Sequence, residues 1–207
     1  MNSGTFSILA AYKNRKAMGI AVASGSTSVG SRVPHAMPSV GVVATQTYTN
    51  VDYGVKGLKM LAENLPPREV MEMLLAEDYQ REMRQVAIMD FALRKAFFTG
   101  SKTPEWRGEI IGENYIVIGN FLKNAKVIES IADSFINSQE DLALRLLTAL
   151  KAGSESGGDK RGEKSAAIIV VDTVKVRLNL SIDEHETPIQ ELMKLVKNFK
   201  QENRVPV

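Results

Sequence analysis

The grouping of the β-prone runs most constrains the fold, because these runs come in sets separated by pairs of helical segments. The first set is a hairpin: residues 5–12 and 17–24 are apolar or β-prone, and the KNRK turn at residues 13–16 joins them. Two pairs of helical segments follow later, with apolar residues recurring every three or four positions. Hairpins predominate over crossovers, which favours antiparallel sheets over a doubly wound parallel sheet.

The expected strands are residues 5–12, 17–24, 40–47, 85–90, 95–99, 115–119, 165–171 and 174–180. The expected helices are residues 53–65, 68–84, 121–136 and 140–152, with a closing helix that has Pro188 in its first turn. Gly153 is expected to cap the helix that precedes it. Helix pairs inserted between strand groups can cover the outer faces of two stacked sheets. The sequence therefore predicts an α+β fold, a four-layer αββα sandwich of two antiparallel sheets covered by helices.

The length and composition are those of one folded domain. The chain has 207 residues, of which 44% are hydrophobic and 24% are charged. We expect a single domain over residues 1–207, with a possible leader at residues 1–4 and a C-terminal helix and tail at residues 187–207. The net charge of +2 is spread along the chain. A nucleic-acid partner is not expected, because phosphate binding needs a concentrated basic face.

Neither a membrane nor the secretory route is expected. The longest apolar run, at residues 166–171, is far short of the roughly 20 residues that span a bilayer. The N-terminus lacks the charged region followed by an apolar run that marks a secretory signal. We therefore expect a cytoplasmic protein.

The residue types restrict the chemistry. Cysteine is absent, which excludes disulfides, thiolate nucleophiles and zinc sites with sulfur ligands. The two histidines are His35 and His185, so a three-histidine zinc site is impossible. The DEHE run at residues 183–186 is interpreted as solvated charge between a strand and a helix, and no metal site is expected. GSTSVGSR has the glycine spacing of a phosphate-binding loop, but Ser31 and Arg32 stand where Lys and Ser or Thr belong. GGDKRGEKS has one residue inserted and precedes a strand, so it lacks the following helix whose amides bind phosphate.

Ten motifs resemble one family when they are taken together in this order. They are TFSILAA, GIAVASGS, VGSRVPHA, VGVVATQTYTN, YGVKGL, REMRQVAIMD, FFTG, ENYIVIGN, GGDKRGEKSAA and IDEHETPIQEL. The family is labelled a domain of unknown function and is grouped with the N-terminal nucleophile (Ntn) hydrolases; the resemblance runs from Thr5 to beyond Leu192. The order of elements also resembles that of proteasome β-subunits, which are αββα sandwiches.

The resemblance implies a nucleophile at the start of the first strand. In Ntn hydrolases the first residue's side chain attacks an amide carbonyl while its own α-amine takes the proton, and no cofactor is needed. Thr5 matches this position and follows Gly4, with Ser7 as the fallback. A free α-amine has a pKa near 7.7–8.0 and can act as a base at neutral pH. Cleavage after Gly4 is required, because the Thr5 nitrogen is otherwise part of a peptide bond.

Further site residues follow from the same resemblance. Asp159 and Ser165 lie where proteasome subunits keep an Asp and a Ser beside the nucleophile, and are expected to position Thr5. Arg32 or Arg161 would lower the pKa of the nucleophile by nearby positive charge.

Three more residues are candidates for substrate binding. Gln46 and Asn120 stand at the ends of their strands and could donate to an oxyanion. His35 lies in a proline-flanked loop that could line a pocket.

The leading hypothesis is an amidohydrolase that cleaves a small amide or acylated amino compound. The alternative is a catalytically silent Ntn-like fold that binds a ligand or assembles as a subunit. A third possibility is a hydroxyl activated by Lys or His, without processing. The partner is a small-molecule substrate or ligand, and the resemblance implies a homo-oligomer. The sequence does not distinguish a peptide, an acyl amide or a lactam.

Overall fold

The computed structural model describes residues 4–12 and 16–203 of the chain. Most of the KNRK turn, residues 1–3 of the expected leader and residues 204–207 of the tail lie outside the described residues. The strands are β1 (Thr5–Ala11), β2 (Ala17–Ser24), β3 (Pro34–Met37), β4 (Gly41–Thr47), β5 (Arg84–Asp90), β6 (Lys95–Thr99), β7 (Gly108–Ile111), β8 (Tyr115–Asn120), β9 (Ser165–Asp172) and β10 (Val176–Ile182). The α-helices are α1 (Asp52–Ala62), α2 (Pro67–Glu77), α3 (Lys126–Asn137), α4 (Leu142–Glu155) and α5 (Pro188–Asn203).

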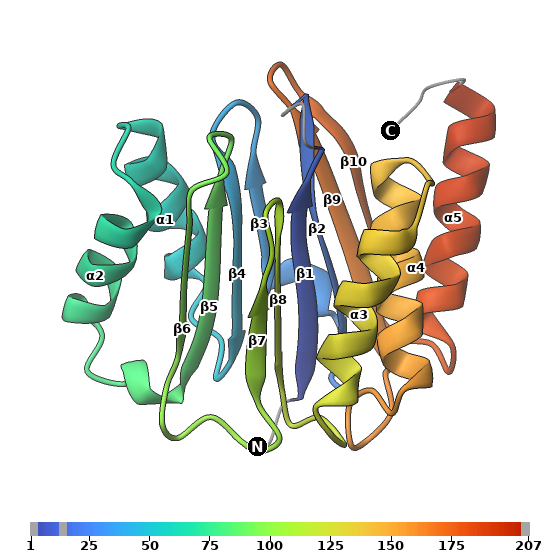
Figure 1. Ribbon diagram of the computed structural model, residues 1–207, viewed down its shortest axis with the longest axis horizontal. Coiled ribbons are helices and arrows are strands. Elements are labelled where there is room, and N and C mark those ends of the chain that lie inside the picture. The colour runs from blue at the N-terminus through green and yellow to red at the C-terminus, as the bar shows by residue number, and fades with distance from the viewer. Residues whose placement is uncertain (1–3, 13–15, 204–207) are drawn as a thin grey trace.

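The strands form two antiparallel sheets, and the predicted mixture of helices and antiparallel strands is confirmed. The large sheet has the strand order β10-β9-β2-β1-β8-β7, and the small sheet has the order β3-β4-β5-β6. Helices α1 and α2 lie beyond the small sheet on one side of the molecule, and α3, α4 and α5 lie beyond the large sheet on the other (Figure 1). Among the helices that the structure describes, none is both long enough and apolar enough to cross a membrane.

Strand alternation decides which side chains face the space between the sheets. On β1, Phe6 and Ile8 pack in the cluster shared with α3, α4 and α5. Leu9 belongs instead to the cluster that lies between the two sheets, with Val42 and Met89 of the small sheet. Because successive strand residues point to opposite faces, Thr5 is on the same face as Leu9. Its side chain therefore stands at the end of β1 on the face turned toward the small sheet.

The helix expected at residues 68–84 is shorter than predicted. It ends at Glu77, where Asp78 adopts an extended backbone conformation. The Asp78 carboxylate then accepts a hydrogen bond from the backbone amide of Gln80, which stabilises a turn in place of further helix. Arg84 opens β5 instead of closing the helix.

Other boundaries also differ from the prediction. Gly153 lies inside α4 and does not cap it, because the helix continues to Glu155. The chain reverses at Gly157 and Gly158, whose φ angles of 130° and 56° suit glycine. Strands β3 and β7 were not predicted, and α3 begins at Lys126, later than the expected residue 121.

Candidate active site

Four polar side chains stand side by side on the inner face of the large sheet, where the pattern of that face would otherwise place apolar residues. They are Ser165, Ser24, Thr5 and Asn120, on β9, β2, β1 and β8, and we call them the polar row. The strand register pairs Thr5 with Ser24 and with Asn120, and pairs Ser24 with Ser165. None of the four is more than 3% exposed. Sheet pairing thus gathers residues that are up to 160 positions apart in the chain.

The carbonyl group before Thr5 lies at the centre of this row. The Thr5 hydroxyl donates a hydrogen bond of 2.6 Å to the Gly4 carbonyl oxygen. Ser24 Oγ donates to the same oxygen at 2.6 Å, and Arg161 Nη2 donates at 3.3 Å. Donors aimed at one carbonyl oxygen polarise it and stabilise negative charge that develops there. The surroundings of the Gly4 carbonyl are therefore those of an oxyanion-binding site.

Asp159 is fully buried and holds Arg161 in place. Its Oδ1 accepts from the backbone amide of Arg161 at 2.9 Å and from Arg161 Nε at 3.1 Å. Its Oδ2 accepts from Arg161 Nη2 at 2.9 Å and from the Gly25 amide at 2.8 Å. Among the described residues, no hydrogen bond joins Asp159 to Thr5. Asp159 therefore acts on the Gly4 carbonyl through Arg161, as a positioning residue.

Two glycines allow the chain to approach this ion pair closely. A Cβ atom on Gly4 would lie 2.4 Å from Asp159 Oδ2, and one on Gly25 would lie 2.7 Å from the same atom. The Asp159 carboxylate is held by the hydrogen bonds described above and cannot move aside easily. The structure therefore gives a steric reason for glycine directly before Thr5.

A network of side-chain amides connects the polar row with the small sheet. Gln46 Nε2 donates to the Thr5 carbonyl oxygen at 3.2 Å and to Gln85 Oε1 at 2.8 Å, while Gln46 Oε1 accepts from Ser7 Oγ at 2.7 Å. Asn120 Nδ2 also donates to Gln85 Oε1, at 3.0 Å. Both predicted oxyanion donors, Gln46 and Asn120, thus direct amide hydrogens into this network. Besides the Thr5 hydroxyl itself, the donors that reach the Gly4 oxygen are Ser24 and Arg161.

Three predicted site residues make their hydrogen bonds away from Thr5: Ser165, Arg32 and His35. Ser165 belongs to the polar row, but its hydroxyl donates to the Ser26 carbonyl at 2.6 Å and accepts from the Val29 amide at 3.2 Å. It therefore holds the loop after β2. Arg32 is exposed and donates to the Thr27 carbonyl at 2.6 Å.

His35 lies on the far side of the small sheet. On β3 it pairs with Val43, which packs under α1 and α2, and a Cβ on Gly54 of α1 would lie 2.1 Å from the His35 ring. Burial lowers the pKa of His35 and outweighs the hydrogen bond to the Arg32 carbonyl. His35 is therefore a packed imidazole under α1, and it does not line the space beside Thr5.

The sequence analysis missed two residues of the site. Ser24 could have been found, because a hairpin of residues 5–12 and 17–24 places residue 24 opposite residue 5. Gln85 carried no such signal. It is the first residue of an ordinary predicted strand, and only the packing of one sheet on the other brings its side chain to Asn120.

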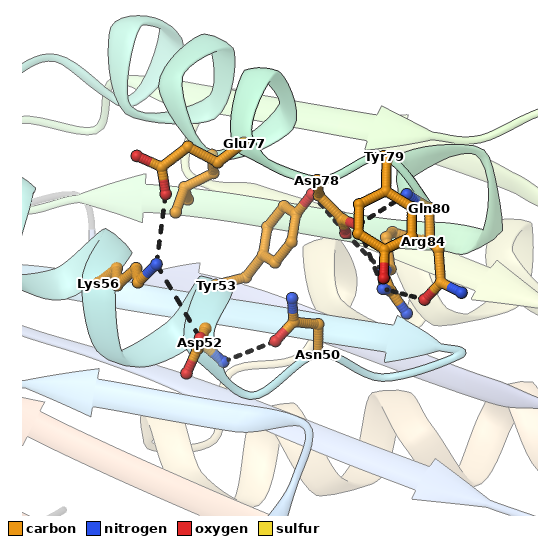
Figure 2. A pocket seen from close by; sticks show the side chains of 10 residues that line it. Asn50, Asp52, Tyr53, Lys56, Glu77, Asp78, Tyr79, Gln80 and Arg84 are labelled. Carbon is orange, nitrogen blue, oxygen red and sulfur yellow. Dashed lines mark hydrogen bonds and ion pairs between the residues drawn. The ribbon is translucent and has the colours of Figure 1, made fainter.

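A hollow of about 310 Å³ opens elsewhere, between the start of α1 and the segment after α2 (Figure 2). Its charged groups satisfy one another: Lys56 pairs with Glu77 at 3.2 Å, and Arg84 pairs with Asp78 at 2.7 Å. The Tyr53 hydroxyl donates to Asp78, and burial together with the Asp78 charge raises the pKa of Tyr53 well above its usual range. No residue of the polar row lines this hollow. We therefore assign both ion pairs a structural role.

Within the described part of the chain, no group of three or more His, Asp or Glu side chains is placed to hold a metal ion. The polar groups around the Gly4 carbonyl are hydroxyls, side-chain amides and the Asp159–Arg161 pair.

Comparison with known proteins gives a family and a structural relative. A family model described as a family of unknown function, DUF1028, matches residues 5–192. The fold is similar to the crystal structure of protein SPO2555 from Silicibacter pomeroyi, which carries the same family description. The two chains are 31% identical, the match covers 95% of this chain and 89% of that one, and the TM-score is 0.89. No curated protein matches the chain.

Proposed function

This chain belongs to the DUF1028 family of unknown function, and we propose that it is an N-terminal nucleophile hydrolase with Thr5 as its nucleophile. The proposed reaction is hydrolysis of a small amide or of an acylated amino compound. The observation that carries the proposal is the Gly4 carbonyl, which lies beside the Thr5 hydroxyl and accepts hydrogen bonds from Ser24 and Arg161.

The same geometry supports removal of the leader. Thr5 Oγ1 attacks the Gly4 carbonyl carbon, and the negative charge that develops on the carbonyl oxygen is stabilised by Ser24 and Arg161. The Gly4–Thr5 carbon–nitrogen bond then breaks, the proton lost by the Thr5 hydroxyl passes to the Thr5 nitrogen, and an ester remains between Gly4 and Thr5 Oγ1. Water hydrolyses this ester, which releases the leader as a carboxylic acid and leaves Thr5 with a free α-amine.

The free amine supplies the base that the uncleaved site lacks. Among the described residues, no carboxylate or imidazole forms a hydrogen bond with the Thr5 hydroxyl. Its contacts are the Gly4 carbonyl and Ser24 Oγ, the latter at 3.1 Å. An α-amine with a pKa near 7.7–8.0 can accept the hydroxyl proton at neutral pH. A substrate amide would then react as the Gly4–Thr5 bond did, with its carbonyl oxygen in the place of the Gly4 oxygen.

The architecture supports the same proposal. Helices, small sheet, large sheet and helices follow one another across the molecule, which agrees with a four-layer αββα sandwich (Figure 1). Thr5 opens a central strand of the large sheet and faces the other sheet. This is the place that the nucleophile occupies in the Ntn arrangement described above.

Intact-protein mass spectrometry tests the proposal directly. We expect the untagged chain to have a mass that begins at Thr5, and the Thr5→Ala variant to keep its leader. Ser7→Ala is the matched control, because Ser7 is the fallback nucleophile; this variant should still be processed. Processed protein should then release 4-nitroaniline from acyl 4-nitroanilides, and Thr5→Ala should not.

A wild-type mass that retains residues 2–4 would sink the mechanism. Ligand binding without catalysis, or an unprocessed hydroxyl activated by another group, would then be the remaining functions.

A further inference from the structure

One buried acceptor in the polar row has no partner. Asn120 is 0% exposed, and its Oδ1 forms no hydrogen bond within the part of the chain that the structure describes. A buried polar atom left without a partner has lost its hydrogen bonds to water and gained none in return, which is unfavourable. Buried polar atoms are nearly always satisfied, so an exception beside a candidate nucleophile points to a ligand group.

The orientation of the Asn120 amide follows from its neighbours. Gln85 Nε2 donates to the backbone carbonyls of Gly119, at 3.0 Å, and Gly108, at 3.3 Å. A carbonyl oxygen cannot donate, so the side-chain nitrogen of Gln85 must face these two groups and its Oε1 must face the other way. That oxygen accepts from Gln46 and from Asn120. Asn120 therefore turns its nitrogen to Gln85, and its oxygen is the free atom.

The free oxygen lies on the side of Thr5 opposite to the oxyanion donors. The row runs Ser24, Thr5, Asn120 across neighbouring strands, and the Gly4 carbonyl oxygen is held on the Ser24 side. An amide seated on Thr5 with its oxygen on the Ser24 side presents its other substituents toward Asn120. Resting on the function proposed above, we propose that Asn120 Oδ1 accepts the N–H of the substrate amide.

This contact names the substrate class. Primary and secondary amides carry the required N–H, whereas an ester of the same shape places an oxygen against Asn120 Oδ1. A buried polar group built to bind an N–H discriminates strongly against an analogue that lacks it, because the group is then left unpaired. The site therefore selects amides over esters, although esters are the more reactive compounds in solution.

Binding of a matched pair of probes tests this selection without relying on turnover. Acetanilide and phenyl acetate have nearly the same shape and differ in N–H against oxygen. We would measure their dissociation constants by ligand-observed NMR for the wild-type protein from which the leader has been removed. We expect acetanilide to bind about tenfold to a hundredfold more tightly than phenyl acetate.

Two variants test whether Asn120 is responsible for the preference for acetanilide. Asn120→Leu keeps the approximate size and removes the acceptor, and should reduce the ratio of affinities to about one. Asn114→Leu is the matched control: Asn114 is also buried, and it lies at the other end of β8, about 20 Å away along the strand. It should keep the wild-type ratio. Thermal melting shows whether each variant is folded.

Equal affinities in the wild type, a preference that persists in Asn120→Leu, or no binding of either probe would each overturn the inference. If the preference for acetanilide persists in Asn120→Leu and the pH dependence of acyl transfer to Thr5 also changes, the inference is likewise overturned. Asn120 Oδ1 would then accept a hydrogen bond from the α-amine of Thr5 and not from the substrate. An acetanilide preference that depends on Asn120 but comes with no release of aniline would support the inference and count against the hydrolase alone.

Discussion

Replacement of Ser24 by alanine should block removal of the leader while leaving the fold intact. The Ser24 hydroxyl donates the shorter of the two neighbouring hydrogen bonds at the Gly4 oxygen, 2.6 Å against 3.3 Å for Arg161. Loss of one oxyanion donor costs about 2.7–4 kcal/mol in the transition state, or roughly a hundredfold to a thousandfold in rate. Because Arg161 remains, we expect the lower end of this range, about a hundredfold.

The effect of Ser24→Ala on stability should be small. Apart from the Gly4 oxygen, Ser24 Oγ has two polar neighbours: the Ser26 amide donates to it at 3.1 Å, and Thr5 Oγ1 lies 3.1 Å away. A single hydrogen bond contributes about 1 kcal/mol net. A chain of this size melts about 2–4 °C lower for each kcal/mol lost. The melting temperature should therefore fall by only a few degrees, so slow processing could not be ascribed to unfolding.

Ser165→Ala is the matched comparison, since it also removes a buried serine hydroxyl from the polar row. Ser165 contacts Ser26 and Val29 and does not reach Gly4, so its loss leaves buried loop groups unpaired, at a cost of about 1–3 kcal/mol. We expect a similar fall in melting temperature and a much smaller loss of processing rate. Intact-mass time courses and thermal melts measure both. Processing of Ser24→Ala at the wild-type rate would refute the oxyanion assignment.

Two predictions concern stability. Asp78→Asn should lower the free energy of unfolding by about 3–5 kcal/mol in denaturant titrations at pH 7, because it leaves the buried Arg84 guanidinium without its counter-charge. Burial raises the pKa of Asp78, but the hydrogen bonds from Arg84 and the Gln80 amide outweigh it and hold this pKa below its usual value. The wild type should therefore lose this contribution only below about pH 4, as Asp78 becomes protonated, and a variant as stable as the wild type at pH 7 would contradict the argument. Gly25→Ala should cost about 1–3 kcal/mol, because its Cβ would lie 2.7 Å from the buried Asp159 carboxylate; an unchanged denaturation midpoint would contradict this close packing.

The sequence predicts the order of elements well because local patterns determine it, and the misses have local causes. Strand β3 begins at Pro34, and proline usually argues against a strand. It is accepted here because β3 is an edge strand of the small sheet. Strand β7 has four residues, too few for a clear alternation. The predicted second helix runs past Glu77, where the real helix ends. An end at Asp78 was predictable, because the apolar spacing of Val70 and Leu74 stops before this charged residue.

The candidate site was predictable only where strand pairing follows from the hairpin. Thr5 and Ser24 pair at the open end of the first hairpin, so their contact is implied by the two predicted strands. Gln85 and Asn120 meet because one sheet packs on the other, and no spacing in the sequence reports that packing. The orientation of the Asn120 amide depends in turn on backbone carbonyls that bind Gln85.

The polar row itself is an argument for function that does not depend on any family. The row lies at the strand ends, at Ser165, Ser24, Thr5 and Asn120. Two residues further along the same face, the strands carry apolar residues such as Ala167, Val22 and Ile118, which belong to the cluster between the sheets. Apolar side chains there would bury without needing partners, so the polar residues bring no advantage in stability. Three of them form hydrogen bonds through their hydroxyls, and the Asn120 Oδ1 oxygen has no partner among residues 4–12 and 16–203. Local departures from the most stable pattern are expected at functional sites, and this departure is confined to one end of the large sheet, around the Gly4 carbonyl.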